Sequence, residues 1–66
     1  MQALMIQTFC LAQQNAGEWE WIPDYAGWSV DFDTMVQMSD DGFEVEIDGV
    51  VTPVQTLKQL KELTGH

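Results

Sequence analysis

Apolar and polar residues alternate along the middle of this chain, and the alternation predicts a small β-sheet. In the segment 18–22 the alternation runs as far as Trp21, in 43–47 it is complete, and residues 28–33 begin in the same way. A period of two is typical of strands that bury one face. In the segment 28–33 we expect Phe32 on the apolar side with Trp28 and Val30. The alternation loses its phase at Thr34 and Met35, which indicates a bulge or a short turn.

Turn-forming residues separate these segments. Pro23 ends the first strand, because it cannot donate to a ladder, and residues 24–27 read as a turn. Residues 39–42, Ser-Asp-Asp-Gly, form a strong turn signal. Asp48-Gly49 is a favoured two-residue hairpin turn, and it predicts a short return strand at Val50-Val51.

The end of the chain shows a helical period instead. Thr52 is suited to an N-cap, Pro53 to the first helical position, and Gly65 to the residue after the last turn. We therefore predict a helix over about residues 53–64. Its apolar residues recur at helical spacing: Val54, Leu57, Leu60 and Leu63.

The first segment fits neither pattern cleanly. Its apolar and polar residues scatter around a helical wheel and do not alternate, as in an element that is buried on both faces. Residues 14–17 form a turn signal between this segment and the strand at 18–22. A strand, a tight turn and a second strand would form a hairpin, so we interpret residues 4–12 as a strand. A helix that closes at Gly17 is the alternative.

These elements predict a single small domain of the α+β class over residues 1–66. Three to five short antiparallel strands form a meander, and the C-terminal helix packs on its apolar face. A chain of 66 residues buries only about 60% of the surface that its unfolded form exposes. Its stability is therefore marginal and depends on tight aromatic packing or on association.

The net charge of the chain limits the kinds of partner that it can bind. The formal net charge is −9, and ten of the eleven acidic residues lie between residues 18 and 48, where no Lys or Arg occurs. Binding to nucleic acid or to an anionic membrane depends on Lys and Arg, so we expect no direct contact with either. The expected partner is the basic surface of a protein. The alternative is a charged face that only keeps the protein in solution.

Strand geometry would arrange these acids in rows. Residues two apart in a strand lie about 6.5–7 Å apart on the same face. We expect Glu18 with Glu20, Asp31 with Asp33, and Glu44 with Glu46 and Asp48, as a lattice of carboxylates that imitates nucleic acid. The predicted partner-binding residues are Glu18, Glu20, Asp31, Asp33, Asp40, Asp41, Glu44, Glu46, Asp48 and Tyr25.

The aromatic residues have a double interpretation. Five of them crowd into a short segment: Trp19, Trp21, Tyr25, Trp28 and Phe32. A domain of this size needs them for its core, and one or two exposed members would serve as anchors for a partner. A stacking platform for single-stranded nucleic acid would need a basic groove, which is absent here.

No catalytic, cofactor or metal motif is recognisable, so we expect a non-enzymatic protein without a cofactor. Cys10 is the only cysteine and His66 the only histidine, which is too few for a disulfide or a structural zinc site. A reducing, cytoplasmic setting follows. A calcium loop that begins at Asp31 would fail at Met35 and Val36. The apolar N-terminal run is too short to span a membrane.

The segment 19–38 resembles the small modular DNA-binding domain found beside HNH-type homing endonucleases in phage genomes. The matching residues are Trp19, Ile22, Pro23, Tyr25, Gly27, Trp28, Val30 and Val36. That family has Gly-Arg where this chain has Thr34-Met35 and a basic residue where this chain has Gln37, and its gap between the residues that match Gly27 and Trp28 is longer. The resemblance implies a short-stranded scaffold of mobile-element origin, with a binding surface of inverted sign.

Two hypotheses follow. The first is an acidic inhibitor from a phage or mobile element, which acts against host defence by occupying the basic surface of a nucleic-acid-handling protein. The second is a structural or assembly module, a homodimer whose sheet edges or N-terminal apolar segments pair.

Overall fold

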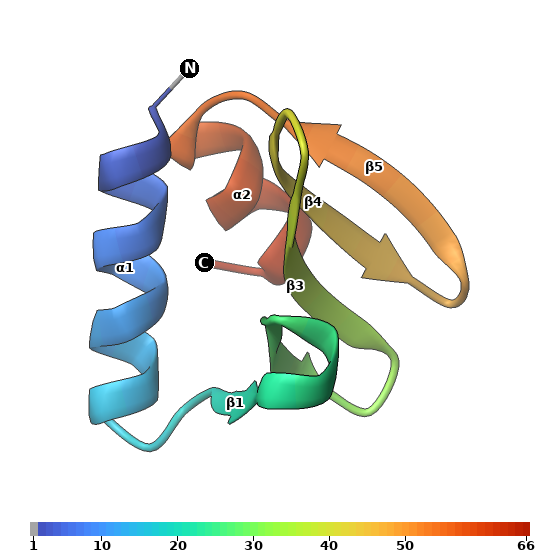
Figure 1. Cartoon of the computed structure of the whole chain (residues 1–66). Coiled ribbons are helices and arrows are strands. Elements are labelled where there is room, and N and C mark those ends of the chain that lie inside the picture. Colours follow the sequence, from blue (N-terminus) through green and yellow to red (C-terminus); the bar gives the residue numbers. More distant parts are fainter. Residues whose placement is uncertain (1) are drawn as a thin grey trace.

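The computed structural model describes residues 2–66 as a five-stranded antiparallel sheet with two α-helices (Figure 1). The strands follow one another in space as they do in the chain, so the predicted meander and the α+β class are confirmed. The elements in order are α1 (Ala3–Asn15), β1 (Glu20–Ile22), the 3-10 turn η1 (Pro23–Tyr25), β2 (Gly27–Asp31), β3 (Thr34–Ser39), β4 (Gly42–Ile47), β5 (Val50–Val54) and α2 (Leu57–Thr64).

The first segment is a helix, so the strand predicted at residues 4–12 is wrong and its alternative is confirmed. Of the 13 residues of α1, only Ile6 and Cys10 are buried. Because further apolar residues lie on its outer side, the helix shows no single apolar stripe from which its period could be read. It ends with two hydrogen bonds, from Gly17 N–H to the Gln14 carbonyl and from Glu18 N–H to the Gln13 carbonyl. This Schellman pattern uses the left-handed conformation of Gly17, whose φ is +78°.

The hairpin turns form where the sequence predicts them. Asp40 and Asp41 connect β3 to β4, and Asp48 and Gly49 connect β4 to β5. The φ angles of Asp48 and Gly49 are 52° and 83°, as a two-residue turn of this kind requires. The register of β2 against β3 shifts between Ser29 and Asp31, which confirms an irregularity just before the expected position.

The C-terminal helix begins four residues later than predicted. Residues 52–54 continue β5 and pair with β4, and Pro53 lies opposite Glu44. Proline is tolerated there because β5 is an edge strand. The helix starts at Leu57 with Thr56 as its N-cap. The Thr56 hydroxyl accepts a hydrogen bond from Gln59 N–H, and the Gln59 side chain accepts one from Thr56 N–H, both at 3.1 Å.

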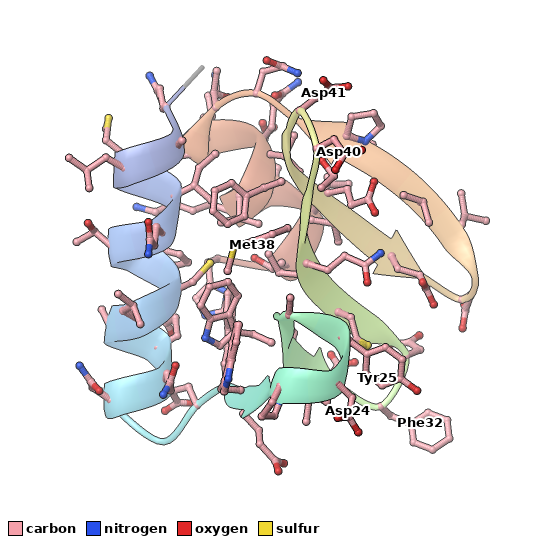
Figure 2. The ribbon with its side chains drawn as sticks, in the orientation of Figure 1. Asp24, Tyr25, Phe32, Met38, Asp40 and Asp41 are labelled. Atoms are coloured by element: carbon pink, nitrogen blue, oxygen red, sulfur yellow. The ribbon has the colours of Figure 1, made fainter. Side chains whose placement is uncertain are left out.

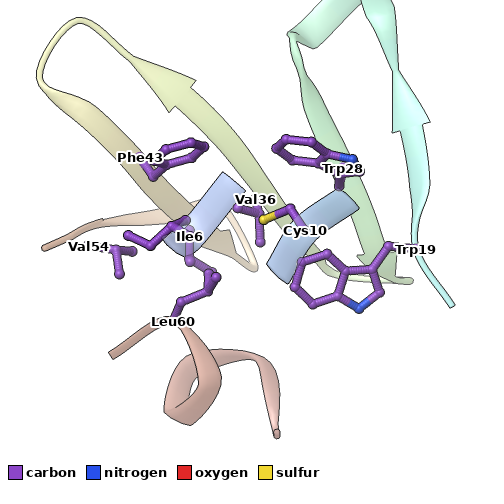
Figure 3. Packing of buried hydrophobic residues seen from close by; sticks show 9 residues of the cluster. Ile6, Cys10, Trp19, Trp28, Val36, Phe43, Val54 and Leu60 are labelled. Atoms are coloured by element: carbon purple, nitrogen blue, oxygen red, sulfur yellow. The ribbon is translucent and has the colours of Figure 1, made fainter. Parts of the chain in front are cut away.

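One hydrophobic core lies between the sheet and the two helices (Figure 3). The register sets Trp28, Val36 and Val45 opposite one another on neighbouring strands, so they share the face that α1 and α2 cover. Within residues 2–66 no helix covers the other sheet face, which is called the outer face below. The buried apolar residues are Ile6, Cys10, Trp19, Trp28, Val36, Phe43, Val45, Val54 and Leu60.

The buried Cys10 thiol leads to a first prediction. Burial in the apolar core raises the pKa of Cys10 to about 12, so the thiol stays protonated and out of reach of reagents. We expect Ellman's reagent at about pH 8 to modify Cys10 only at the rate at which the protein unfolds. Because the folded pKa lies above the unfolded one, the free energy of unfolding should be independent of this group below about pH 8 and fall as pH rises toward 12.

A Ser39→Cys variant is the control, since Ser39 is an exposed residue at the end of β3. It should react at once with a single equivalent of reagent. Fast reaction of two equivalents in the folded variant would show that Cys10 is accessible and contradict the prediction.

Candidate protein-binding surface

The outer face of the sheet carries carboxylates, although they do not form a lattice. Glu46 on β4 lies between Met35 on β3 and Val51 on β5. Glu44 lies between Gln37 and Pro53 in the same way. Each of these carboxylates therefore has an apolar or uncharged residue opposite it on both neighbouring strands. The like-charge pairs that we expected across strands are avoided.

Glu44 and Glu46 are the pair that the structure places as predicted. They lie two residues apart on the same side of β4. The Gln37 side-chain amide donates a hydrogen bond of 2.9 Å to the Glu44 carboxylate. Glu20 is on β1, on the far side of β2 and β3 from this pair, and Glu18 precedes β1.

The expected row that would include Asp31 and Asp33 is wrong. The register shift in β2 sets Asp31 opposite Thr34, whose side chain is buried on the core side, rather than in line with Ser29 and Met35. Asp33 lies in the turn before β3 and not in a strand. The extra residue in β2 reverses the side to which the following residues belong.

Asp31 and Asp33 instead meet Asp48 at one end of the sheet, a set of residues that we call the acidic corner. Asp48 N–H donates a hydrogen bond of 3.0 Å to the Asp33 carbonyl, which joins the β4–β5 turn to the β2–β3 turn. Asp33 N–H donates to the Asp31 carboxylate at 3.2 Å. Hydrogen bonds with the Asp31 and Thr34 side chains hold the pKa of the Asp33 carboxyl below its ordinary value. Asp33 therefore keeps its negative charge at neutral pH.

Two aromatic residues project near this end. Phe32, between Asp31 and Asp33 in the β2–β3 turn, is fully exposed, so its predicted place on the apolar face is wrong. Tyr25 in η1 exposes 64% of its surface. In Figure 2 both rings lie at the end of the molecule that also carries Asp24. The loss of alternation after Phe32 is the signal in the sequence that points to a ring outside the core.

Asp40 and Asp41 lie at the opposite end of β3 and β4 (Figure 2). The structure thus divides the predicted site into three parts: the acidic corner, the outer-face pair Glu44 and Glu46, and the β3–β4 turn. In residues 2–66 no three acidic, cysteine or histidine side chains are arranged to hold a metal ion.

The positive charges lie elsewhere. Lys58 and Lys61 both belong to α2, on the side of the sheet opposite the outer face. The Lys61 ammonium is 5.2 Å from the centre of the Phe9 ring, in a cation–π contact. The sheet and its turns carry nine carboxylates and no Lys or Arg, and Glu18 adds a tenth just before β1.

Comparison with known proteins brings no relative. No family model matches the chain, and neither a curated protein nor a solved structure resembles it. The resemblance of residues 19–38 to the phage DNA-binding module therefore stays a prediction. Within residues 2–66 no helix is long and apolar enough to cross a membrane.

Proposed function

We propose that this protein is a non-enzymatic acidic binding protein that occupies a basic surface of a nucleic-acid-handling protein. The observation that supports it is the separation of charge: nine carboxylates lie on the sheet and its turns, Glu18 lies just before β1, and both lysines are behind them on α2. Such a surface attracts a basic partner over a distance and aligns it before contact.

The acidic corner is the centre of this proposal. Asp31, Asp33 and Asp48 present carboxylates from two turns joined by a backbone hydrogen bond, and Phe32 stands exposed between two of them. An exposed aromatic ring surrounded by charge is the usual composition of an interface anchor. Arginine side chains suit such a partner, because they pair with carboxylates and stack on rings.

Origin and compartment belong to the same proposal. The module-like segment 19–38 favours a phage or mobile element, in which an inhibitor of host defence would be useful. The lone buried thiol of Cys10 is consistent with the reducing cytoplasm.

The experiment is a pull-down from the native host, followed by binding titrations with the captured protein. We expect the affinity to fall at least tenfold between about 50 and 500 mM salt, because the contacts are charged. Duplex DNA or RNA should compete for the same surface. A captured partner that binds nucleic acid and this protein at once, or an affinity independent of salt, would contradict the proposal.

Charge-matched variants locate the surface. The triple variant Asp31→Asn, Asp33→Asn and Asp48→Asn has a net charge of −9 + 3 = −6. The control triple Asp40→Asn, Asp41→Asn and Glu62→Gln has the same charge. We expect the first to weaken binding at least tenfold more than the second, since only the first removes the acidic corner. Equal losses would show that net charge alone matters.

A further inference from the structure

Helix α1 has a second apolar surface that faces away from the core. Leu4, Met5 and Leu11 expose 76, 52 and 42% of their surfaces, and Thr8 and Ala12 are exposed between them. Residues 4, 8 and 11 recur at helical spacing, with 5 and 12 alongside, on the side opposite Ile6 and Cys10. We call these five residues the outward stripe.

A helix on the surface of a soluble domain normally has charged or polar residues on that side. Helix α1 has no charged residue in its 13 positions, although the whole chain carries a net charge of −9. Beside the stripe lies an apolar groove of about 450 Å³, lined by Leu4, Met5, Thr8, Phe9, Ala12 and Leu57. A partner that covers this surface must itself be apolar there.

We propose that the outward stripe is the interface of a homodimer, in which two copies pack α1 against α1. Self-association requires a surface on which two strongly acidic molecules can approach, and α1 supplies it because it is uncharged. The outer face lies on the other side of the sheet from α1, so both copies keep their carboxylates apart (Figure 1). The rim toward α2 carries Lys58, Lys61 and Glu62, and a patch with both signs is complementary to itself.

Two-fold symmetry sets the geometry. In an antiparallel pair of helices the residue nearest the axis faces its own copy, and Thr8 lies midway between Leu4 and Leu11. Leu4 of one copy then lies near Leu11 of the other. The small side chains of Thr8 and Ala12 let the two helices approach closely at the crossing.

The sheet edges are poor alternatives. In β5 the pairs Ile47–Val50 and Val45–Thr52 are the hydrogen-bonded ones, since a two-residue turn is closed by such a pair. Val51 and Pro53 therefore direct their nitrogen atoms outward, and Pro53 has no N–H to donate. The other edge, β1, has only three residues. Both features are typical of edges that do not pair further.

The size of the interface sets the expected strength. A stable interface takes about 800 Å² from each partner. That is about a fifth of the 4251 Å² surface of this protein. Helix α1 is only about 20 Å long, so an interface built on this helix is small. We therefore expect a dimer near the lower end of the size range, which dissociates on dilution. Its dissociation constant should lie in the micromolar range.

The test is the mass in solution, measured by sedimentation over a range of concentrations. The 7.5 kDa chain should approach twice that mass, and added salt should strengthen the dimer because it screens the repulsion between two acidic copies. Salt is expected to weaken binding to a basic partner, so the two proposals fail independently. A mass of one chain up to about 1 mM at both low and high salt would overturn the dimer.

Matched variants then locate the interface. Leu4→Glu should raise the dissociation constant by about 100-fold, because it places a charge in an apolar contact. Val50→Glu changes the net charge equally at a residue that is 66% exposed on the β4–β5 hairpin, and it should leave the dimer intact. Both variants should keep the circular dichroism spectrum of the wild type. Equal effects of the two variants on the dimer would overturn the assignment to α1.

Cross-linking tests the two-fold axis. Thr8→Cys should form a disulfide-linked dimer on mild oxidation, whereas Ser39→Cys on β3 should not, and the buried Cys10 does not interfere. Equal rates of cross-linking for the two variants would overturn the α1–α1 arrangement.

Discussion

The variant Trp28→Ala is expected to be largely unfolded at room temperature. Trp28 is 2% exposed, and its ring lies 4.9 Å from that of Trp21. Removing a buried tryptophan costs about 3–5 kcal/mol. A chain of 66 residues has a free energy of unfolding of only roughly 3–10 kcal/mol in total. The loss therefore takes up most of the stability that a domain of this size has.

A hydrogen bond adds to this effect. The Trp28 indole N–H donates to the Gln14 side-chain oxygen at 2.9 Å and so ties β2 to the last turn of α1. Trp28→Phe keeps much of the ring volume and loses this bond, so it should be intermediate between the wild type and Trp28→Ala. Urea denaturation followed by circular dichroism measures all three, because tryptophan fluorescence changes with the substitution itself.

Phe32→Ala is the control for Trp28. It removes an aromatic ring of similar hydrophobicity four residues away, and that ring is fully exposed. We expect a change in the free energy of unfolding within about 0.5 kcal/mol. A Trp28→Ala variant that melts within a few degrees of the wild type would contradict the core described above.

The second large effect is expected from Gly27→Ala. A β-carbon at this position would lie 2.5 Å from the Val36 carbonyl oxygen and 2.9 Å from the Gln37 β-carbon, closer than such atoms approach. The first of these contacts is backbone, so β2 and β3 must move apart where they pair. We expect the free energy of unfolding to fall by about 2–3 kcal/mol, as measured by urea denaturation.

Gly17→Ala is the matched control. It makes the same substitution where nothing lies within 4 Å, but where φ is +78°. Left-handed strain alone costs about 1 kcal/mol. The steric clash at Gly27 should therefore exceed the conformational strain at Gly17, and the reverse order would show that the sheet yields easily at β2.

Gly27 and Trp28 both belong to the segment 19–38, for which the sequence predicts a resemblance to the phage module, and in this fold both serve packing. Of the other motif residues, Trp19 and Val36 are buried, Ile22 and Val30 are partly buried, and Pro23 and Tyr25 are exposed. A scaffold can therefore keep such a pattern while its surface charge changes, because packing and charge reside on different side chains.

Local chemistry in the sequence determined the hairpins and the most regular strand. Asp48-Gly49 and the Asp40–Gly42 turn can adopt few conformations, and strict alternation in β4 permits only one buried side. The apolar spacing of Leu57, Leu60 and Leu63 likewise predicted α2, although not its first residue. Two threonines, Thr52 and Thr56, are both followed by residues that can begin a helix, and pairing of residues 52–54 with β4 decided between them.

Tertiary structure alone decided the rest. The apolar residues on both sides of α1 hide the helical period, so the element could be identified only from what packs against it. One extra residue in β2 moved Asp31 and Asp33 from the outer face to the acidic corner and turned Phe32 out of the core. Composition determined that the protein is strongly acidic. Which carboxylates stand together depended on a register shift in β2 and on a hydrogen bond between two turns. The shift depends on a single inserted residue, and the hydrogen bond joins residues that are distant in the sequence.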